Sequence, residues 1–165
     1  MWPGSGRNCN QMKLFKRIGL VTLVVLVGLQ FIPTRSNQSA EVPSTDFVLT
    51  YKVSGEMGRI LHTSCYNCHS NNTDYPWYSR VQPVGLLLEH HINKGKAELN
   101  FSEFGTYSLR KQKSKLKSMA NQIEKDEMPL SSYTLIHRDA RLSKNRKKAL
   151  VDYFNALQDS LQQNP

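Results

Sequence analysis

Cysteine is scarce in this sequence, whose 165 residues contain only Cys9, Cys65 and Cys68. A structural zinc site commonly uses four ligands in two spaced pairs. Because a second closely spaced cysteine pair is missing, zinc would need Cys65, Cys68 and two of the five histidines. A zinc site is therefore an alternative that lacks a familiar ligand pattern.

The alternation of apolar and polar residues that marks β-strands is also missing, and so are internal repeats. Without it, the βαβ setting of thioredoxin-like dithiol enzymes is not indicated around Cys65 and Cys68, although a dithiol redox pair stays an alternative. Apolar residues instead recur at helical spacing, which predicts an all-α protein. We expect helices from about residue 54 to the cysteines, from about 83 until Gly95 ends the helix, from about 108 to just before Pro129, and from about 143 onward.

Acidic residues are absent before Glu41. The longest apolar run, Ile18 to Ile32, is preceded by the basic residues Arg7, Lys13, Lys16 and Arg17. Its 15 residues are fewer than the roughly 20 of a transmembrane helix and match the upper end of a signal sequence's apolar region, about 7–15. We expect a membrane anchor or a signal sequence, with the N-terminus in the cytoplasm and the rest of the chain outside it.

Apolar residues are few elsewhere, since the mean hydropathy is −0.51 and much of the apolar content lies in that run. The core of the exported part is therefore expected to be modest. We divide the chain into a basic cytoplasmic N-terminus (1–17), an anchor or signal segment (18–32), a linker (33–45), a folded domain (46–160) and a tail (161–165).

The segment Cys65-Tyr66-Asn67-Cys68-His69 matches the attachment signature of c-type haem in every fixed position. Two thiols at this spacing add to the two vinyl groups on one porphyrin edge, and the adjacent imidazole then binds the iron. Neither residue between the cysteines is proline, so a helical turn can form there. We therefore expect Cys65 and Cys68 to attach one haem c and His69 to be the proximal iron ligand.

Three segments, "SCYNCHSNNTDYPWYSRVQPVG", "LNFSEFG" and "MPLSSYTLIHRDARLS", occur in this order. In them the chain resembles the bacterial family of membrane-tethered, cytochrome c-like haem-binding domain proteins, over about Val42 to Phe154. The resemblance implies a small cytochrome c-like helical domain around one covalent haem, anchored by a single span in the bacterial inner membrane and lying in the periplasm. The stretch after Arg110 is richer in lysine than the resemblance implies, which bears on the partner and not on the haem.

The second axial ligand is expected to be Met128, by elimination among the five methionines. Met57 lies on the same predicted helix as Cys65, and Met119 falls on the apolar stripe of another helix. Met128 precedes Pro129, where the chain is extended, and two helices separate it from His69. The alternatives are three histidines: His90, His91 and His137.

Aromatic residues follow the motif closely and are suited to cover a porphyrin, because Trp and Tyr combine an apolar ring with a polar tip. We expect contacts to the haem from Trp77 first and also from Tyr75 and Tyr78. Arg80 is expected to neutralise a propionate.

The formal net charge is +9, and lysines dominate the late part of the chain. A basic face near a haem can steer an acidic redox partner. Nucleic-acid binding is not expected, because these lysines spread around a helix and the domain lies outside the cytoplasm. The sequence indicates an anchored electron carrier that is not an enzyme; the alternative is a haem-based sensor that binds a diatomic ligand.

Overall fold

The computed structural model describes residues 6–39, 41–53 and 55–163. All regular secondary structure in these ranges is helical, apart from an isolated bridge between Gln38 and Asn72. The predicted all-α class is therefore confirmed. The chain divides into two compact units, the first comprising residues 1–36 and 75–90 and the second residues 37–74 and 91–165.

The first unit contains helix α1 (Gly6–Leu29), the short 3-10 helix η2 (Trp77–Arg80) and the start of α5 (Val84–Glu98). The Gln30 side chain accepts from the Gln82 N–H at 3.0 Å and donates to the Gln82 carbonyl at 3.0 Å. Gln82 Oε1 in turn accepts the N–H of Leu86 at 2.9 Å, which satisfies an otherwise unpaired donor in the first turn of α5. The sequence predicts that this helix begins at about Pro83, and it begins one residue later, at Val84.

None of the described helices combines the length and the apolar character needed to cross a membrane. The predicted transmembrane anchor is thus not found in the structure. The apolar run that starts at Ile18 extends past the last residue of α1, Leu29, while the first half of the helix carries Lys13, Lys16 and Arg17.

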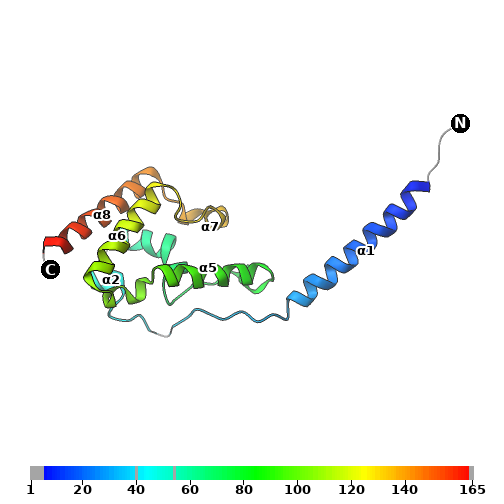
Figure 1. Cartoon of the computed structure of the whole chain (residues 1–165), viewed down its shortest axis with the longest axis horizontal. Coiled ribbons are helices and arrows are strands. Elements are labelled where there is room, and N and C mark those ends of the chain that lie inside the picture. Colours follow the sequence, from blue (N-terminus) through cyan, green and yellow to red (C-terminus); the bar gives the residue numbers. More distant parts are fainter. Residues whose placement is uncertain (1–5, 40, 54, 164–165) are drawn as a thin grey trace. The chain divides into compact units, whose positions relative to one another are not determined.

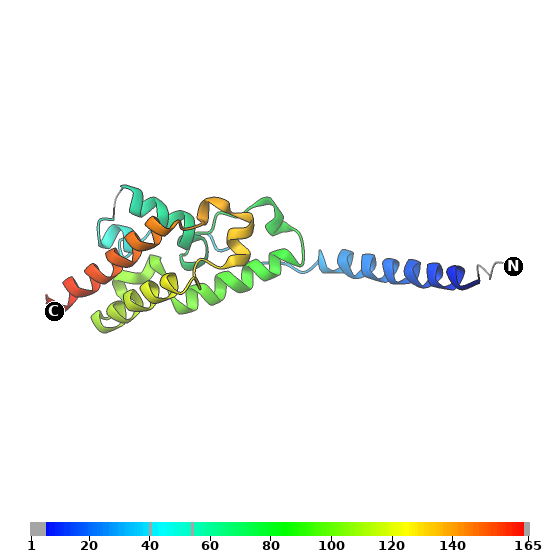
Figure 2. The ribbon, with the colours of Figure 1, turned by 90° about the horizontal axis from the view of Figure 1, so that it is seen from above.

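The second unit begins with α2 (Phe47–Thr50) and a helical stretch made of α3 (Gly55–Leu61), the π-helix η1 (His62–Tyr66) and α4 (Asn67–His69). The end of α5, the 3-10 helix η3 (Phe101–Thr106) and α6 (Leu109–Glu124) follow. Then come α7 (Ser131–Ile136), the 3-10 helix η4 (Arg138–Ala140) and α8 (Lys144–Gln163). Helices α6 and α8 lie side by side in both views (Figures 1 and 2).

The core of the second unit is built from phenylalanines that meet edge to face. Phe47 of α2 contacts Phe104 at a centroid distance of 4.9 Å and Phe101 at 5.4 Å, and it reaches Phe154 of α8 at 6.3 Å. All four are almost completely buried, and each such side chain contributes about 1.5–3 kcal/mol through burial. This cluster connects α2, η3 and α8 and so fixes the scaffold on which the cysteine motif lies.

Gly95 lies inside α5, which continues to Glu98, so the prediction that this glycine ends the helix is wrong. The reason is a close approach between chain segments. A Cβ atom at Gly95 would lie 2.6 Å from the carbonyl oxygen of Cys68. Glycine is therefore required here for contact between α5 and the cysteine motif.

Candidate functional site

The motif residues lie at the end of the α3–η1–α4 stretch, and contacts on both sides of it hold them in place. The Ser64 hydroxyl donates to the carbonyl of Ala140 at 3.0 Å. The Tyr66 hydroxyl donates to Oδ1 of the buried Asp46 at 2.9 Å, and that oxygen also accepts the Val48 N–H at the start of α2. Ser64 and Tyr66 both belong to the π-helix η1, and a π-helical turn is often found at functional sites.

Tyr66, which stands between the two cysteines, contributes its ring as well as its hydroxyl. The ring stacks on Phe101 at 4.9 Å with an interplanar angle of 5°, and Phe101 meets the His69 ring at 6.4 Å and 79°. Burial raises the pKa of Tyr66, and the nearby Asp46 raises it further. Tyr66 therefore stays protonated and keeps donating to Asp46.

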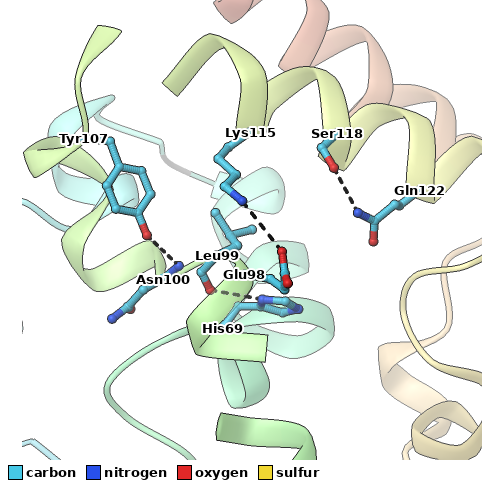
Figure 3. Close-up of polar contacts among 8 residues, drawn as sticks. All are labelled: His69, Glu98, Leu99, Asn100, Tyr107, Lys115, Ser118 and Gln122. Carbon is cyan, nitrogen blue, oxygen red and sulfur yellow. Dashed lines mark hydrogen bonds and ion pairs between the residues drawn. The ribbon is translucent and has the colours of Figure 1, made fainter. Parts of the chain in front are cut away.

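His69 is held in one tautomer by a backbone carbonyl. Its Nδ1 lies 3.1 Å from the oxygen of Leu99 (Figure 3). Because a carbonyl oxygen only accepts, Nδ1 carries the proton, and Nε2 of the neutral ring keeps its lone pair. Burial lowers the pKa of His69, which favours the neutral ring. This is the arrangement that a metal-binding histidine needs.

Cys65 and Cys68 are free thiols, each half-buried. Burial raises the pKa of Cys65 to about 12, with a smaller contribution from Cys68, and burial also raises the pKa of Cys68. Catalytic dithiols usually have a lowered thiol pKa, so the dithiol alternative is disfavoured. Within the described residues there is no group of three or more His, Cys, Asp or Glu side chains able to hold a metal ion, which leaves the zinc alternative without a ligand set.

A cavity of about 430 Å³ opens beside the motif and lies entirely within the second unit. This volume falls in the range of about 300–1,000 Å³ that is usual for cofactor pockets. Cys65, Cys68, His69 and Met128 all line it. The apolar part of the lining comes mainly from Leu99, Phe101, Met119, Ile123, Leu130, Leu142 and Phe154.

Met128 reaches the cavity because of the way α6 ends. Asp126 adopts a left-handed conformation with φ of 59°, which Asp tolerates better than most residues. The N–H groups of Glu127 and Met128 then both turn back to the carbonyl of Gln122, at 2.9 and 3.3 Å. Lys147 of α8 pairs with the Asp126 carboxylate and holds this turn against α8. The turn places Met128 on the cavity wall.

The lining fits a haem in its chemistry. A porphyrin needs apolar walls, and its iron needs ligands from two directions. The cavity offers the imidazole of His69 at the end of α4, with Nδ1 held by the Leu99 carbonyl, and a thioether from the segment after α6, with two thiols close to the imidazole in sequence. Among the described lining residues, the Lys and Glu side chains are Lys94, Glu98 and Lys115.

The structure does not bring every predicted contact residue to this cavity. Tyr75, Trp77, Tyr78 and Arg80 belong to the first unit and are not among the residues that line it; the Trp77 side chain is 80% exposed. Their contacts with haem stay predictions.

The alternative axial histidines separate in the same way. His91 lines the cavity, and His90 belongs to the first unit. His137 stacks on Tyr133 at 4.3 Å and is not part of the lining.

Three features of the site were missed by the sequence analysis: the Leu99 carbonyl, the close approach at Gly95 and the position of Lys115 in the lining. A carbonyl has no signature in a sequence, and a packing glycine looks like a helix terminator. The spacing of Lys115 from Met119 and Gln122, one and two turns away on the same helical face, is the signal that could have located it.

Over the residues that the structure describes, the protein is helical, and its cavity is chemically suited to a haem. The family model described as "Haem-binding domain" matches residues 24–156, and the chain belongs to this haem-binding domain family. No curated protein and no solved structure matches the chain.

Proposed function

We propose that this protein carries one haem c, attached through thioether bonds from Cys65 and Cys68, and that it transfers electrons. Nε2 of His69 is the proximal iron ligand and the thioether sulfur of Met128 the distal one. The observation that carries the proposal is the convergence of these four side chains on one apolar cavity while the Leu99 carbonyl fixes the His69 tautomer.

The bound haem supplies one-electron chemistry at its iron. The chain's own part is to orient the imidazole through Leu99 and Phe101, to exclude water with the apolar lining, and to supply a thioether, which raises the reduction potential. Electron transfer requires no acid–base pair, so the proposed role is that of an electron carrier and not of a catalyst.

A location outside the cytoplasm is part of the proposal. Its support is the sequence itself, in which a positively charged start followed by an apolar run of 15 residues is typical of a signal sequence. Fractionation of expressing bacterial cells tests it directly: the haem-stained protein is expected outside the cytoplasm.

Covalent attachment is tested by replacing both motif cysteines. The variant Cys65→Ala/Cys68→Ala, expressed in a host with haem-attachment machinery, is expected to lose haem staining on a denaturing gel. Cys9→Ala is the control, since it removes the third cysteine and leaves the motif intact. A pyridine haemochrome spectrum of the wild type identifies the bond type, and a colourless wild-type protein would contradict the proposal.

Binding of a diatomic ligand is a second candidate, favoured by one observation. Ser118 and Gln122 also line the cavity, and Nε2 of Gln122 donates to Oγ of Ser118 at 2.9 Å. Such a polar pair can stabilise a bound polar ligand. Rapid carbon monoxide binding to the reduced wild type would support this function over electron transfer.

A further inference from the structure

One edge of the cavity is polar, although most of its wall is apolar. On α6, the lining residues Lys115, Ser118 and Gln122 follow one another at the spacing of a single helical face (Figure 3). On α5, Lys94 and Glu98 lie one turn apart and also line the cavity. The lining therefore contains two lysines and one glutamate, which together carry a net positive charge.

Lys115 is distinguished from its neighbours on α6 by its surroundings. It lines the cavity, and its side chain is only 26% exposed. Lys113 and Lys117 are not among the lining residues, and the ammonium of Lys111 lies over the ring of Tyr107, 3.7 Å from its centroid. Of these four lysines, Lys115 is the one directed to the cavity.

The present partner of Lys115 is weak. Its Nζ lies 3.9 Å from Oε2 of Glu98, whose side chain is 74% exposed (Figure 3). An ion pair of this length with an exposed partner contributes about 0–1 kcal/mol. Glu98 is therefore easily displaced towards solvent, which leaves a partly buried ammonium group able to take another anion.

We propose that Lys115, together with Lys94, binds the propionate carboxylates of the haem, and that Glu98 gives way to them. This inference rests on the function proposed above and deepens it. A haem is an apolar disc with two carboxylates on one edge, and a carboxylate taken out of water requires a cation or hydrogen-bond donors. The cavity lining combines an apolar wall with two lysines, of which Lys115 is half-buried and Lys94 is exposed.

The test uses the full-length protein with haem attached and compares Lys115→Gln with Lys117→Gln. Both variants remove one positive charge from α6, but only Lys115 lines the cavity. Loss of a cation beside the propionates stabilises the oxidised state. For Lys115→Gln we therefore expect a lower midpoint potential, corresponding to a ferric-to-ferrous ratio roughly three- to ten-fold higher at the wild-type midpoint. For Lys117→Gln we expect a much smaller change.

Two further measurements separate direct contact from a general charge effect. Lys115→Arg keeps the charge and is expected to restore the wild-type potential. The propionate bending mode in the resonance Raman spectrum is expected to shift in Lys115→Gln and to stay unchanged in Lys117→Gln.

Suppose that the wild type carries covalent haem, but Lys115→Gln and Lys117→Gln change the Raman mode and the midpoint potential equally. That result would overturn this inference and leave the proposed function standing. A wild type without covalent haem would instead overturn the proposed function.

Discussion

The orientation of the His69 ring is set by one backbone contact and one side-chain contact. The Leu99 carbonyl directs the Nδ1 proton, and the edge of Phe101 limits how the ring can rotate. Phe101 is itself held by stacking on Tyr66, whose hydroxyl is bound to Asp46. The orientation of one imidazole therefore depends on a buried chain of contacts that reaches α2.

At Met128, replacement by leucine is expected to keep the cavity filled while it removes the thioether sulfur. The potential should fall, because the methionine sulfur favours the reduced iron. Carbon monoxide should also bind faster to the reduced protein, because the distal position is then open. Redox titration and flash photolysis measure the two effects.

Met57→Leu is the control for this substitution, since Met57 packs against the core from α3 and does not line the cavity. If Met128→Leu retained the wild-type potential and the sulfur-to-iron charge-transfer band, another residue would be the distal ligand. His91 would then be the first candidate, because it lines the same cavity.

The thiol of Cys65 gives a prediction about pH in the chain made without haem. Its pKa is raised from 9.0 to about 12, so the folded state holds the thiol proton where the unfolded chain begins to lose it. At about pH 8, alkylation by iodoacetamide is thus expected to be at least roughly ten-fold slower in the folded chain than in denaturant. The folded-state rate should keep rising with pH beyond 9.0.

Mass spectrometry of the peptide that contains Cys65 measures the alkylation rate. A rate that levels off below about pH 8 would instead indicate a lowered thiol pKa, as dithiol enzymes have, and would favour that alternative.

Among the helices, α5 has the most demanding contact with the motif. Gly95→Ala is expected to lower the free energy of unfolding by about 1–3 kcal/mol, because the new methyl group meets the Cys68 backbone and cannot be relieved by a rotamer change. The fraction of chains that acquire covalent haem should fall as well. Denaturant unfolding and haem staining per unit protein are the measurements.

Gly19→Ala in α1 is the matched control, since nothing lies within 4 Å of a Cβ atom there. In that helix interior, alanine is expected to be neutral or to stabilise by up to about 1 kcal/mol. Equal effects of the two substitutions would mean that the approach of α5 to Cys68 does not matter for the fold.

Helix α6 was predictable because it is amphipathic and capped. Ser108 caps α6 by accepting the N–H of Lys111. Apolar residues at helical spacing predict a stripe of Leu109, Leu116, Met119 and Ile123, of which the last three are buried and Leu109 is half-buried. The short helices α2 and α7 have too few residues to show a period, so their existence depends on tertiary contacts such as the burial of Phe47.

Site prediction followed the same division between local pattern and tertiary contact. The sequence spacing of the Cys-X-X-Cys-His motif indicated Cys65, Cys68 and His69, and elimination among the methionines indicated Met128. All four residues line one cavity. Contacts that depend on how distant segments pack, such as Leu99 with His69, leave no mark on the local sequence.

Across the whole molecule, charge is the property that bears on partners. The sequence carries 22 Lys and Arg against 13 Asp and Glu, a net charge of +9. Part of the basic charge is neutralised locally, since Lys147 pairs with Asp126, Arg146 with Glu56 and Lys148 with Asp152. The exposed Lys117 on α6 has no ion-pair partner among the described residues. We propose that this excess steers an acidic redox partner to the protein.

Small oxidants of opposite charge test the steering without knowledge of the partner. The reduced protein is expected to react faster with ferricyanide, an anion, when salt is low, and the rate should fall on the order of ten-fold as the ionic strength rises to about 0.5 M. With the tris(phenanthroline)cobalt(III) cation as oxidant the rate should instead rise with salt, because screening then removes repulsion. Stopped-flow absorbance of the haem measures both rates. The double variant Lys113→Glu/Lys117→Glu should weaken the salt dependence of both rates. If the rates with the two oxidants changed with salt in the same direction, the net charge would not govern the encounter.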